Sequence, residues 1–532
     1  MLMHQPWRRR DTVLYDERCA VVQTAAGTVR GYIRNGIYTF KGLPYGEAGG
    51  PAGRFMRATP PVPWQGVKAC VQYGNISPQV PAGPTPPVGS NTGASDEDLL
   101  LLQRTGGRPV GEDCLVLNLW TPSRDPSAKM PVLVWLHGGG YGFGCGHDLV
   151  AYDGENLAHQ GAVVITINHR LGLLGHFYLA ELGDERYRDS GNIAALDQLL
   201  ALAWVRENIA NFGGDPDCVT IFGQSGGGGK VSTLMGMPAA RGWFHRAIVQ
   251  SGSMPAGVDA TAATELAKAV LEELEIQPHA LDKLHELPVD ELLRAGFAAM
   301  KKRDVRPMMG FGPVVDGVNL PEVSFGEHAP ECSRDVPLLV GTNYHEFTSG
   351  VDNPDAYSLC ADELPDKLRE RLGERTEEML AASYEVFPDI VPFDRYALLS
   401  NWFRTLARKQ AQMKAEQGDA PAYLYWFTWR TPILNGRPGA FHSAEISFAF
   451  DNADRYETYN GGGVEPRRLS AQMSAAWLAF ARRGNPSHPN LPAWPEYDKK
   501  RAKVMVLDDP CRVETDPDTR LERAMAKSKE GR

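Results

Sequence analysis

The segment at residues 219–227 limits the possible folds of this 532-residue chain more than any other. A run of β-branched and aromatic residues, 219–222, leads into a Gly-x-Ser-x-Gly pentapeptide centred on Ser225, and small residues follow. This order predicts a strand, a turn so tight that only glycine fits on either side, and then a helix. Such a turn lifts the Ser225 hydroxyl clear of the backbone, where it can act as a nucleophile.

The glycines do not match the nucleotide-binding motifs. A P-loop opens on a glycine and places a hydroxyl after its Gly-Lys pair. Around Gly229 and Lys230 these two positions hold Gln224 and Val231. The cluster at 142–146 ends in His147, where a dinucleotide fingerprint needs its third glycine. Nothing in the sequence therefore indicates a nucleotide or another organic cofactor.

The composition narrows the class further. A net charge of −10 argues against non-specific binding to nucleic acid. The first thirty residues contain no apolar stretch typical of a secretory signal, and the longest apolar runs, such as 163–167, are too short to span a bilayer. The eight cysteines are scattered without a Cys-x-x-Cys pair, and His-Glu-x-x-His is absent, so we expect free thiols, no zinc site and a cytoplasmic location.

The pattern along the chain predicts an α/β fold in a single domain over residues 1–532, with loose tails at about 1–15 and 513–532. Glycine-broken alternation at 20–45 predicts a small N-terminal antiparallel sheet, and 78–93 is typical of an exposed loop. A helix at 192–209 and helical insertions at 261–300 and 363–417 alternate with strands, which predicts a mainly parallel sheet covered on both faces. The expected strands are 115–120, 132–136, 163–168, 219–222, 247–250, 338–341, 423–429 and 504–507.

A serine nucleophile needs a base, an acid that orients the base, and donors for the oxyanion. Gly138, Gly139 and Gly140 follow His137 directly after a predicted strand, where their bare N–H groups can approach a substrate oxygen together with that of Gly226. In α/β-hydrolases the order along the chain is Ser, then Asp or Glu, then His. Glu346, just past a strand, and His442 fit that order.

Spacing alone leaves the acid open, because a surface glutamate beside a strand is common. Asp316 and Glu445 remain alternative acids. Among thirteen histidines, a packed or exposed neutral side chain is the default interpretation for most.

The chain resembles the type B carboxylesterase family, which also contains the cholinesterases, from about residue 20 to 510. The motifs that carry the resemblance lie at 40–45, 112–120, 135–140, 168–172, 191–225, 313–317 and 480–486. The resemblance implies an α/β-hydrolase fold with helical insertions that form the pocket, and hydrolysis of small-molecule carboxylic esters without a cofactor or metal.

The resemblance also implies roles for individual residues. It places a catalytic triad on Ser225, Glu346 and His442, and the oxyanion donors on Gly139, Gly140 and Gly226. It further implies two structural ion pairs, Arg54 with Glu112 and Arg170 with Asp197.

The chain departs from the family at several positions. The family usually has Glu before the nucleophile and Ala after it, and this chain has Gln224 and Gly226. Many secreted members close a disulfide on the cysteine that matches Cys114, but Ser77 stands where its partner would be, so we expect Cys114 to be free. Lys230 replaces a small residue and requires a carboxylate, a carbonyl or an exit to solvent.

The expected activity is that of a serine carboxylesterase. An amidase or carbamate hydrolase on the same triad is the nearest alternative. A catalytically inactive, cholinesterase-like adhesion protein is a second, from another class. The natural ester and the oligomeric state are left open by the sequence.

Overall fold

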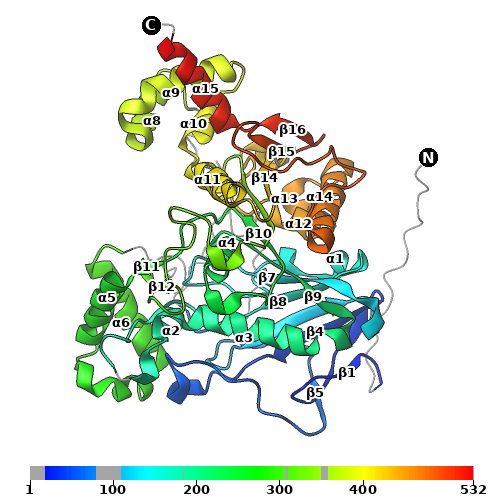
Figure 1. The fold of residues 1–532 in the computed structure, drawn as a ribbon, viewed down its shortest axis with the longest axis vertical. Coiled ribbons are helices and arrows are strands. Elements are labelled where there is room, and N and C mark those ends of the chain that lie inside the picture. The colour runs from blue at the N-terminus through cyan, green and yellow to red at the C-terminus, as the bar shows by residue number, and fades with distance from the viewer. Residues whose placement is uncertain (1–17, 80–108, 184, 306–309, 349–357, 531–532) are drawn as a thin grey trace.

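A computed structural model describes residues 18–79, 109–183, 185–305, 310–348 and 358–530. Its centre is an eleven-stranded sheet, counted over those ranges, in the order β16-β15-β14-β13-β10-β9-β7-β8-β6-β4-β3 (Figure 1). The strands from β8 to β15 in that order pair in parallel, and the outer pairs are antiparallel. The strands are β3 (Tyr32–Arg34), β4 (Ile37–Pro44), β6 (Val116–Thr121), β7 (Met130–Leu136), β8 (Val163–Ile167), β9 (Gly214–Gln224), β10 (Arg246–Gln250), β13 (Leu338–Asn343), β14 (Ala422–Phe427), β15 (Lys503–Leu507) and β16 (Arg512–Thr515).

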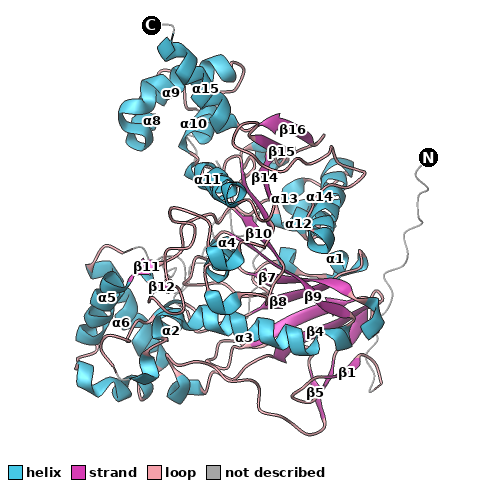
Figure 2. Ribbon diagram, viewed as in Figure 1, coloured by secondary structure: helices cyan, strands magenta, loops and turns pink. Residues whose placement is uncertain are grey.

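Helices cover both faces of this sheet (Figure 2). Alternate residues of β7 divide between two cores: Val132 and Val134 pack with α3, α4 and α11, whereas Leu133 and Trp135 pack with α1, α12 and α14. Because both faces are buried, the central strands are mostly apolar on both sides, as expected from the sequence. The helices are α1 (Glu155–His159), α2 (Gly172–His176), α3 (Ile193–Asn208), α4 (Gly226–Met235), α5 (Ala260–Glu273), α6 (Val289–Lys302), α8 (Leu364–Leu372), α9 (Thr376–Val386), α10 (Pro392–Ser400), α11 (Trp402–Gln417), α12 (Ile446–Ala449), α13 (Glu457–Asn460), α14 (Val464–Arg483) and α15 (Pro517–Glu530).

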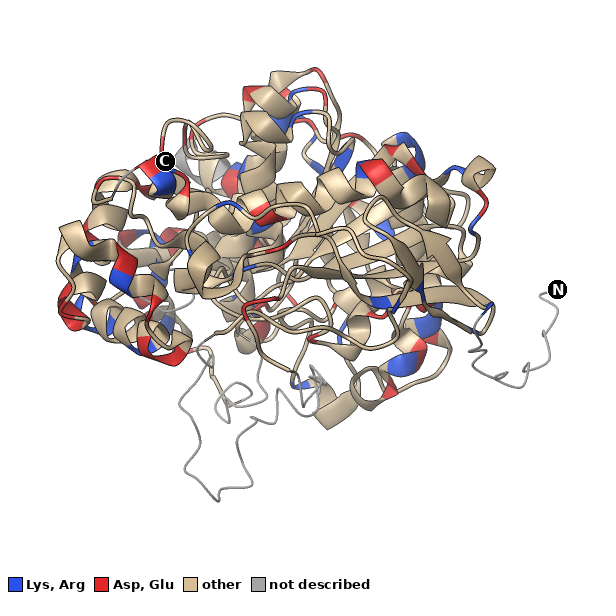
Figure 3. Ribbon diagram, turned by 90° about the horizontal axis from the view of Figure 1, so that it is seen from below, with Lys and Arg blue, Asp and Glu red and all other residues tan. Residues whose placement is uncertain are grey.

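A smaller sheet lies near the N-terminus. Strands β1 (Val21–Gln23) and β2 (Thr28–Arg30) form the expected antiparallel hairpin, and β5 (Val67–Ala69) adds in parallel to β2. The short strands β11 (Val258–Asp259) and β12 (Val314–Val315) pair in parallel beside α5 and α6, and they flank the first helical insertion in sequence (Figure 1). Charged residues of both signs are interspersed around the periphery of the molecule (Figure 3).

The predicted strands and the helix at 192–209 are confirmed within a few residues at their ends. The expected loose tail at 513–532 is wrong, because β16 and α15 occupy most of it. Leu521, Ala524 and Met525 pack against α8 and α9, and Arg404 pairs with Asp518 at 2.8 Å. The predicted tail at 1–15 and most of the loop at 78–93 fall outside the described residues.

The register of the sheet brings three loops together. Strand β9 pairs with β7 on one side, Leu136 against Gly223, and with β10 on the other, Gln250 against Gln224. The carboxyl ends of parallel strands meet at one edge, where ligands bind in open α/β sheets. The glycine loop after β7, Ser225 after β9 and Ser251 after β10 therefore lie side by side.

Candidate active site

The predicted elbow is present at Ser225. It joins β9 to α4 with φ 58° and ψ −125°, a strained conformation that surrounding contacts hold in place. Its backbone N–H donates to the Gln250 carbonyl at 2.8 Å. A Cβ at Gly223 would lie 2.5 Å from the Gly227 carbonyl carbon, and one at Gly227 only 2.0 Å from the Leu136 oxygen. Both flanking glycines are therefore required by close backbone contact.

The glycine loop after β7 packs directly on the elbow. Gly139 and Gly140 have φ values of 89° and 59°, which favour glycine. Gly140 touches Gly226 so closely that a Cβ added to Gly226 would lie 2.4 Å from the Gly140 nitrogen. The backbone of the first residue of α4 thus lies against the loop, at the positive end of the helix dipole, where an anion is stabilised.

The structure brings Glu346 and His442 together. Glu346 Oε2 lies 2.5 Å from Nδ1 of His442, and the His442 backbone N–H donates to the Glu346 carbonyl at 3.1 Å. Both side chains are buried. This contact fixes Nδ1 as the protonated nitrogen and leaves the lone pair on Nε2.

The Nε2 edge of His442 faces the elbow. It lies 3.2 Å from the side-chain nitrogen of Gln224, the residue before Ser225. The Ser443 hydroxyl donates to the oxygen of the same amide at 3.2 Å. Among the described residues, no hydrogen bond joins the Ser225 hydroxyl to His442; the Gln224 amide occupies that lone pair instead.

The two alternative acids lie elsewhere in the hydrogen-bond network. Asp316 accepts from the backbone N–H groups of Val318, Asn319 and Leu320 and so stabilises its own loop. Glu445 accepts from the Asn343 amide at 2.6 Å and from the Gln250 amide at 3.2 Å.

Glu445 differs from Glu346 in its environment. Complete burial, together with the nearby charge of Glu346, raises the pKa of the Glu445 carboxyl to about 7. Of the three carboxylates, Glu346 is the one whose oxygen contacts a ring nitrogen of His442.

Sequence reasoning missed three neighbours of this pair. The Ser251 hydroxyl donates to Glu346 Oε1 at 2.7 Å, and the Asn343 N–H donates to the same oxygen at 2.8 Å. The ring of Phe347, 60% exposed, stacks on His442 with centroids 4.0 Å apart. Only the position of Ser251 just past a predicted strand hinted at its role, and nothing in the sequence marked Phe347.

The structural expectations around the site are confirmed. Arg54 pairs with Glu112, and Arg170 with Asp197, each at 2.6 Å. Cys114 is a free, buried thiol. Lys230 satisfies its requirement for a partner by donating to a carbonyl, that of His137.

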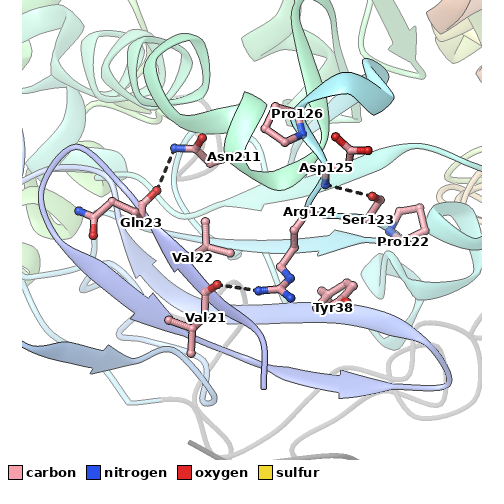
Figure 4. Close-up of a pocket in the computed structure, with 10 residues that line it drawn as sticks. All are labelled: Val21, Val22, Gln23, Tyr38, Pro122, Ser123, Arg124, Asp125, Pro126 and Asn211. Carbon is pink, nitrogen blue, oxygen red and sulfur yellow. Dashed lines mark hydrogen bonds between the residues drawn. The ribbon is translucent and has the colours of Figure 1, made fainter. Parts of the chain in front are cut away.

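A cavity of about 530 Å³ lies between β1 and the turn that follows β6, and Ser225, Glu346 and His442 are not among its lining residues (Figure 4). Its cation, Arg124, is already engaged with the Val21 carbonyl and the ring of Tyr38. Within the described part of the chain, no three His, Cys, Asp or Glu side chains are placed to hold a metal ion, and no helix is both long and apolar enough to cross a membrane.

Known proteins share this architecture. The model of the carboxylesterase family matches residues 18–524. Para-nitrobenzyl esterase of Bacillus subtilis is 35% identical over 96% of this chain and 99% of its own length, and phenmedipham hydrolase of Pseudarthrobacter oxydans is 33% identical over 92% and 95%.

The fold is similar to that of solved esterases. The structure of an esterase from anaerobic Clostridium hathewayi, described as able to hydrolyse aliphatic aromatic polyesters, superposes with a TM-score of 0.82 at 32% identity, over 97% of this chain and 99% of the other. The carboxylesterase EST55 of Geobacillus stearothermophilus superposes with a TM-score of 0.76 at 33% identity, over 95% and 100%. The chain therefore belongs to the carboxylesterase family, has the α/β-hydrolase fold, and is a carboxylic ester hydrolase.

Proposed function

We propose that this protein hydrolyses small-molecule carboxylic esters through an acyl-enzyme on Ser225, with His442 as general base and Glu346 as the residue that orients it. The observation that carries the proposal is the buried 2.5 Å contact between Glu346 and His442, which presents Nε2 to the elbow. The elbow geometry at Ser225 and the contact between Glu346 and His442 support the assignment in addition to the order of the motifs.

The reaction follows from this geometry. Ser225 Oγ attacks the acyl carbonyl as its proton passes to His442 Nε2, and Glu346 stabilises the imidazolium that forms. His442 then gives the proton to the departing alkoxide, which leaves as the alcohol. Water, deprotonated by the same imidazole, attacks the acyl-enzyme and releases the carboxylic acid and free Ser225.

Gln224 must release His442 before the first step. Its amide nitrogen lies 3.2 Å from Nε2 and would compete with Ser225 for the lone pair. A rotation of the Gln224 side chain frees Nε2. Catalytic hydrogen bonds are often formed only when substrate is bound. Bound substrate occupies the space beside the imidazole and so displaces the Gln224 side chain.

The oxyanion of the tetrahedral intermediate forms beside the glycine loop. We assign its donors to the N–H groups of Gly139, Gly140 and Gly226, because the loop and the first residue of α4 are in backbone contact beside Ser225. The positive end of α4 acts in the same direction. Losing one such donor typically costs about 10²–10³ in kcat.

The assignment of the acid is tested by Glu346→Gln. An amide cannot stabilise the imidazolium, so kcat should fall by about 10⁴, while circular dichroism and the thermal midpoint report whether the fold is kept. A variant that retains a tenth of the wild-type rate places the acid elsewhere. Comparing kcat/KM for a matched ester and amide then separates an esterase from an amidase.

We also propose a cytoplasmic location, which the thiols support. Cys70, Cys114, Cys218, Cys332, Cys360 and Cys511 are free. Burial raises the pKa of Cys70 and of Cys114 to about 12, so neither thiol is reactive at neutral pH. Fractionation of the producing cells with an antibody against the protein tests the location, and recovery outside the cytoplasm contradicts it.

A further inference from the structure

Lys230 is buried in the helix that carries the nucleophile. It lies in α4, five residues after Ser225, and its side chain is 2% exposed. Its Nζ donates to the carbonyl of His137, at the end of β7, at a distance of 2.8 Å. The other half of that peptide group is the N–H of Gly138, which begins the glycine loop. Lys230 therefore anchors the first peptide of the glycine loop through a hydrogen bond.

The charge of Lys230 has no anionic partner in the part of the chain that the structure describes. The titratable groups whose pKa the lysine charge affects are His137 from the end of β7, His169 from the loop after β8 and His176 from α2. The Tyr141 hydroxyl lies against the neighbouring residue, Gly229. Within the described residues no carboxylate offsets it, and burial alone lowers the pKa of Lys230 to about 7. The adjacent ion pair of Arg170 and Asp197 is compensated internally.

The surrounding imidazoles do not supply an anion either. Each donates Nδ1–H to a carbonyl: His137 to Gly138, His169 to Arg170 and His176 to Gly191, all at 2.8 Å. Burial is the largest cause that lowers the pKa of His137 and of His169, and the charge of Lys230 lowers both further. Both imidazoles are therefore neutral at physiological pH. When Lys230 is ionised, it is thus a cation among neutral groups.

We propose that the Lys230 ammonium is a positioning and electrostatic residue of the oxyanion site: it fixes the His137–Gly138 peptide and stabilises the developing oxyanion, so that efficient hydrolysis requires its ionised form. The proposal rests on the proposed function of Ser225. It goes beyond it, because it adds a titrating cation that the triad and the oxyanion glycines do not include.

Distance and environment support an electrostatic effect. Five residues of helix rise about 7.5 Å, so the backbones of Lys230 and Ser225 lie about that far apart along the axis of α4. A Cβ placed on Gly138 would lie 3.6 Å from Ser225 Cβ, so the peptide that Lys230 holds adjoins the nucleophile. A unit charge at about 8 Å in a site of effective dielectric near 20 changes the stability of an anion by about tenfold or more.

A second buried lysine provides a matched control. Lys414 in α11 donates to the Ser333 and Arg334 carbonyls at 2.9 and 2.7 Å, away from the proposed active site. Burial lowers its pKa to about 8. Lys414→Met removes a buried, carbonyl-bound ammonium of the same kind, so it reproduces the structural loss without the electrostatic one.

The experiment is the pH dependence of kcat/KM for a neutral ester in the wild type, Lys230→Met and Lys414→Met. Lysine is ionised at low pH, so wild-type kcat/KM should fall as pH rises through the pKa of Lys230, giving a basic limb near neutrality. Lys230→Met should lower the maximum by about tenfold and abolish that limb. Lys414→Met should keep both the limb and its position.

The result that overturns the proposal is a basic limb in Lys230→Met at the wild-type pH, or its absence from the wild type. If Lys230→Met does not fold, the wild type alone decides: the apparent pKa of the basic limb should fall on warming, as expected for an amine, and a pKa that does not move with temperature contradicts the proposal. Ser225→Ala distinguishes failure of the proposed function from failure of this inference. If Ser225→Ala is active, the proposed function is wrong. If it is inactive but the pH profile of Lys230→Met equals that of the wild type, only the inference about Lys230 is wrong.

Discussion

Gly226→Ala should disable the proposed oxyanion site, although the resembling family usually has alanine at this position. An added Cβ would lie 2.2 Å from the Gly140 oxygen and 2.4 Å from the Gly140 nitrogen and Cα. All three are backbone atoms that cannot rotate away. Ordinary contact begins at 3.4 Å, so relieving the closest contact requires the glycine loop and the elbow to separate by the difference between 3.4 and 2.2 Å, about 1.2 Å.

A separation of this size is large for catalysis. Displacing a reacting group by about 1 Å can cost about 10² in rate, and a lost oxyanion donor costs about 10²–10³. We therefore expect kcat to fall by about 10² with KM changed little. Overpacking should cost about 1–3 kcal/mol of stability, partly offset by the better helix propensity of alanine, about 1 kcal/mol.

The assay is steady-state hydrolysis of a small chromogenic ester, with the thermal midpoint measured in parallel. Gly229→Ala is the control in the same helix. Its Cβ would meet only the hydroxyl end of the Tyr141 side chain, at 2.8 Å, which can shift. The reasoning is refuted if Gly226→Ala keeps kcat within threefold of the wild type, or if Gly229→Ala loses as much activity.

The remaining predictions concern charge. Gln224→Glu places an anion about 7 Å from bound substrate, worth about 2 kcal/mol at an effective dielectric near 20. The kcat/KM ratio of a cationic to an anionic ester should therefore rise about tenfold, and a change below threefold indicates that Gln224 acts only through hydrogen bonds. The raised pKa of Glu445, about 7 against an ordinary 4.5, means that the folded protein binds the extra proton, so stability should decline between about pH 4.5 and 7. In Glu445→Gln this part of the decline, up to about 3 kcal/mol in urea unfolding, should vanish; identical pH slopes would contradict it. Denatured, non-reduced protein should yield eight alkylatable thiols by mass spectrometry, and a stable disulfide would exclude a reducing location.

The central fold was predictable because its strands are buried on both faces. The run 132–136 is apolar throughout, 163–167 has Thr166 as its one polar residue, and the elbow motif fixes where β9 must end. The C-terminal helix was not predictable from composition, because charged residues dominate α15. Its apolar stripe, Leu521, Ala524 and Met525, becomes meaningful only when α8 and α9 provide a surface for it.

The candidate site shows a similar division. Ser225 and its glycines are encoded locally, in one pentapeptide. The contacts of Glu346 with Ser251 and with His442 join residues 95 and 96 positions apart, so no local pattern could reveal them. Lys230 lies between these cases: its sequence position required a partner, and only the packing of α4 against the end of β7 identified the His137 carbonyl.

The central claim is that Ser225 forms the acyl-enzyme. The most direct measurement treats the wild type and Ser225→Ala with diethyl 4-nitrophenyl phosphate and locates the phosphoryl group by peptide mass spectrometry. The account predicts one phosphoryl group per wild-type chain, on Ser225, with loss of activity in proportion to labelling. Ser225→Ala should take up no label and lose about 10⁶ in kcat. A stoichiometric adduct on any other residue, or a Ser225→Ala enzyme that retains a tenth of wild-type turnover, would contradict it.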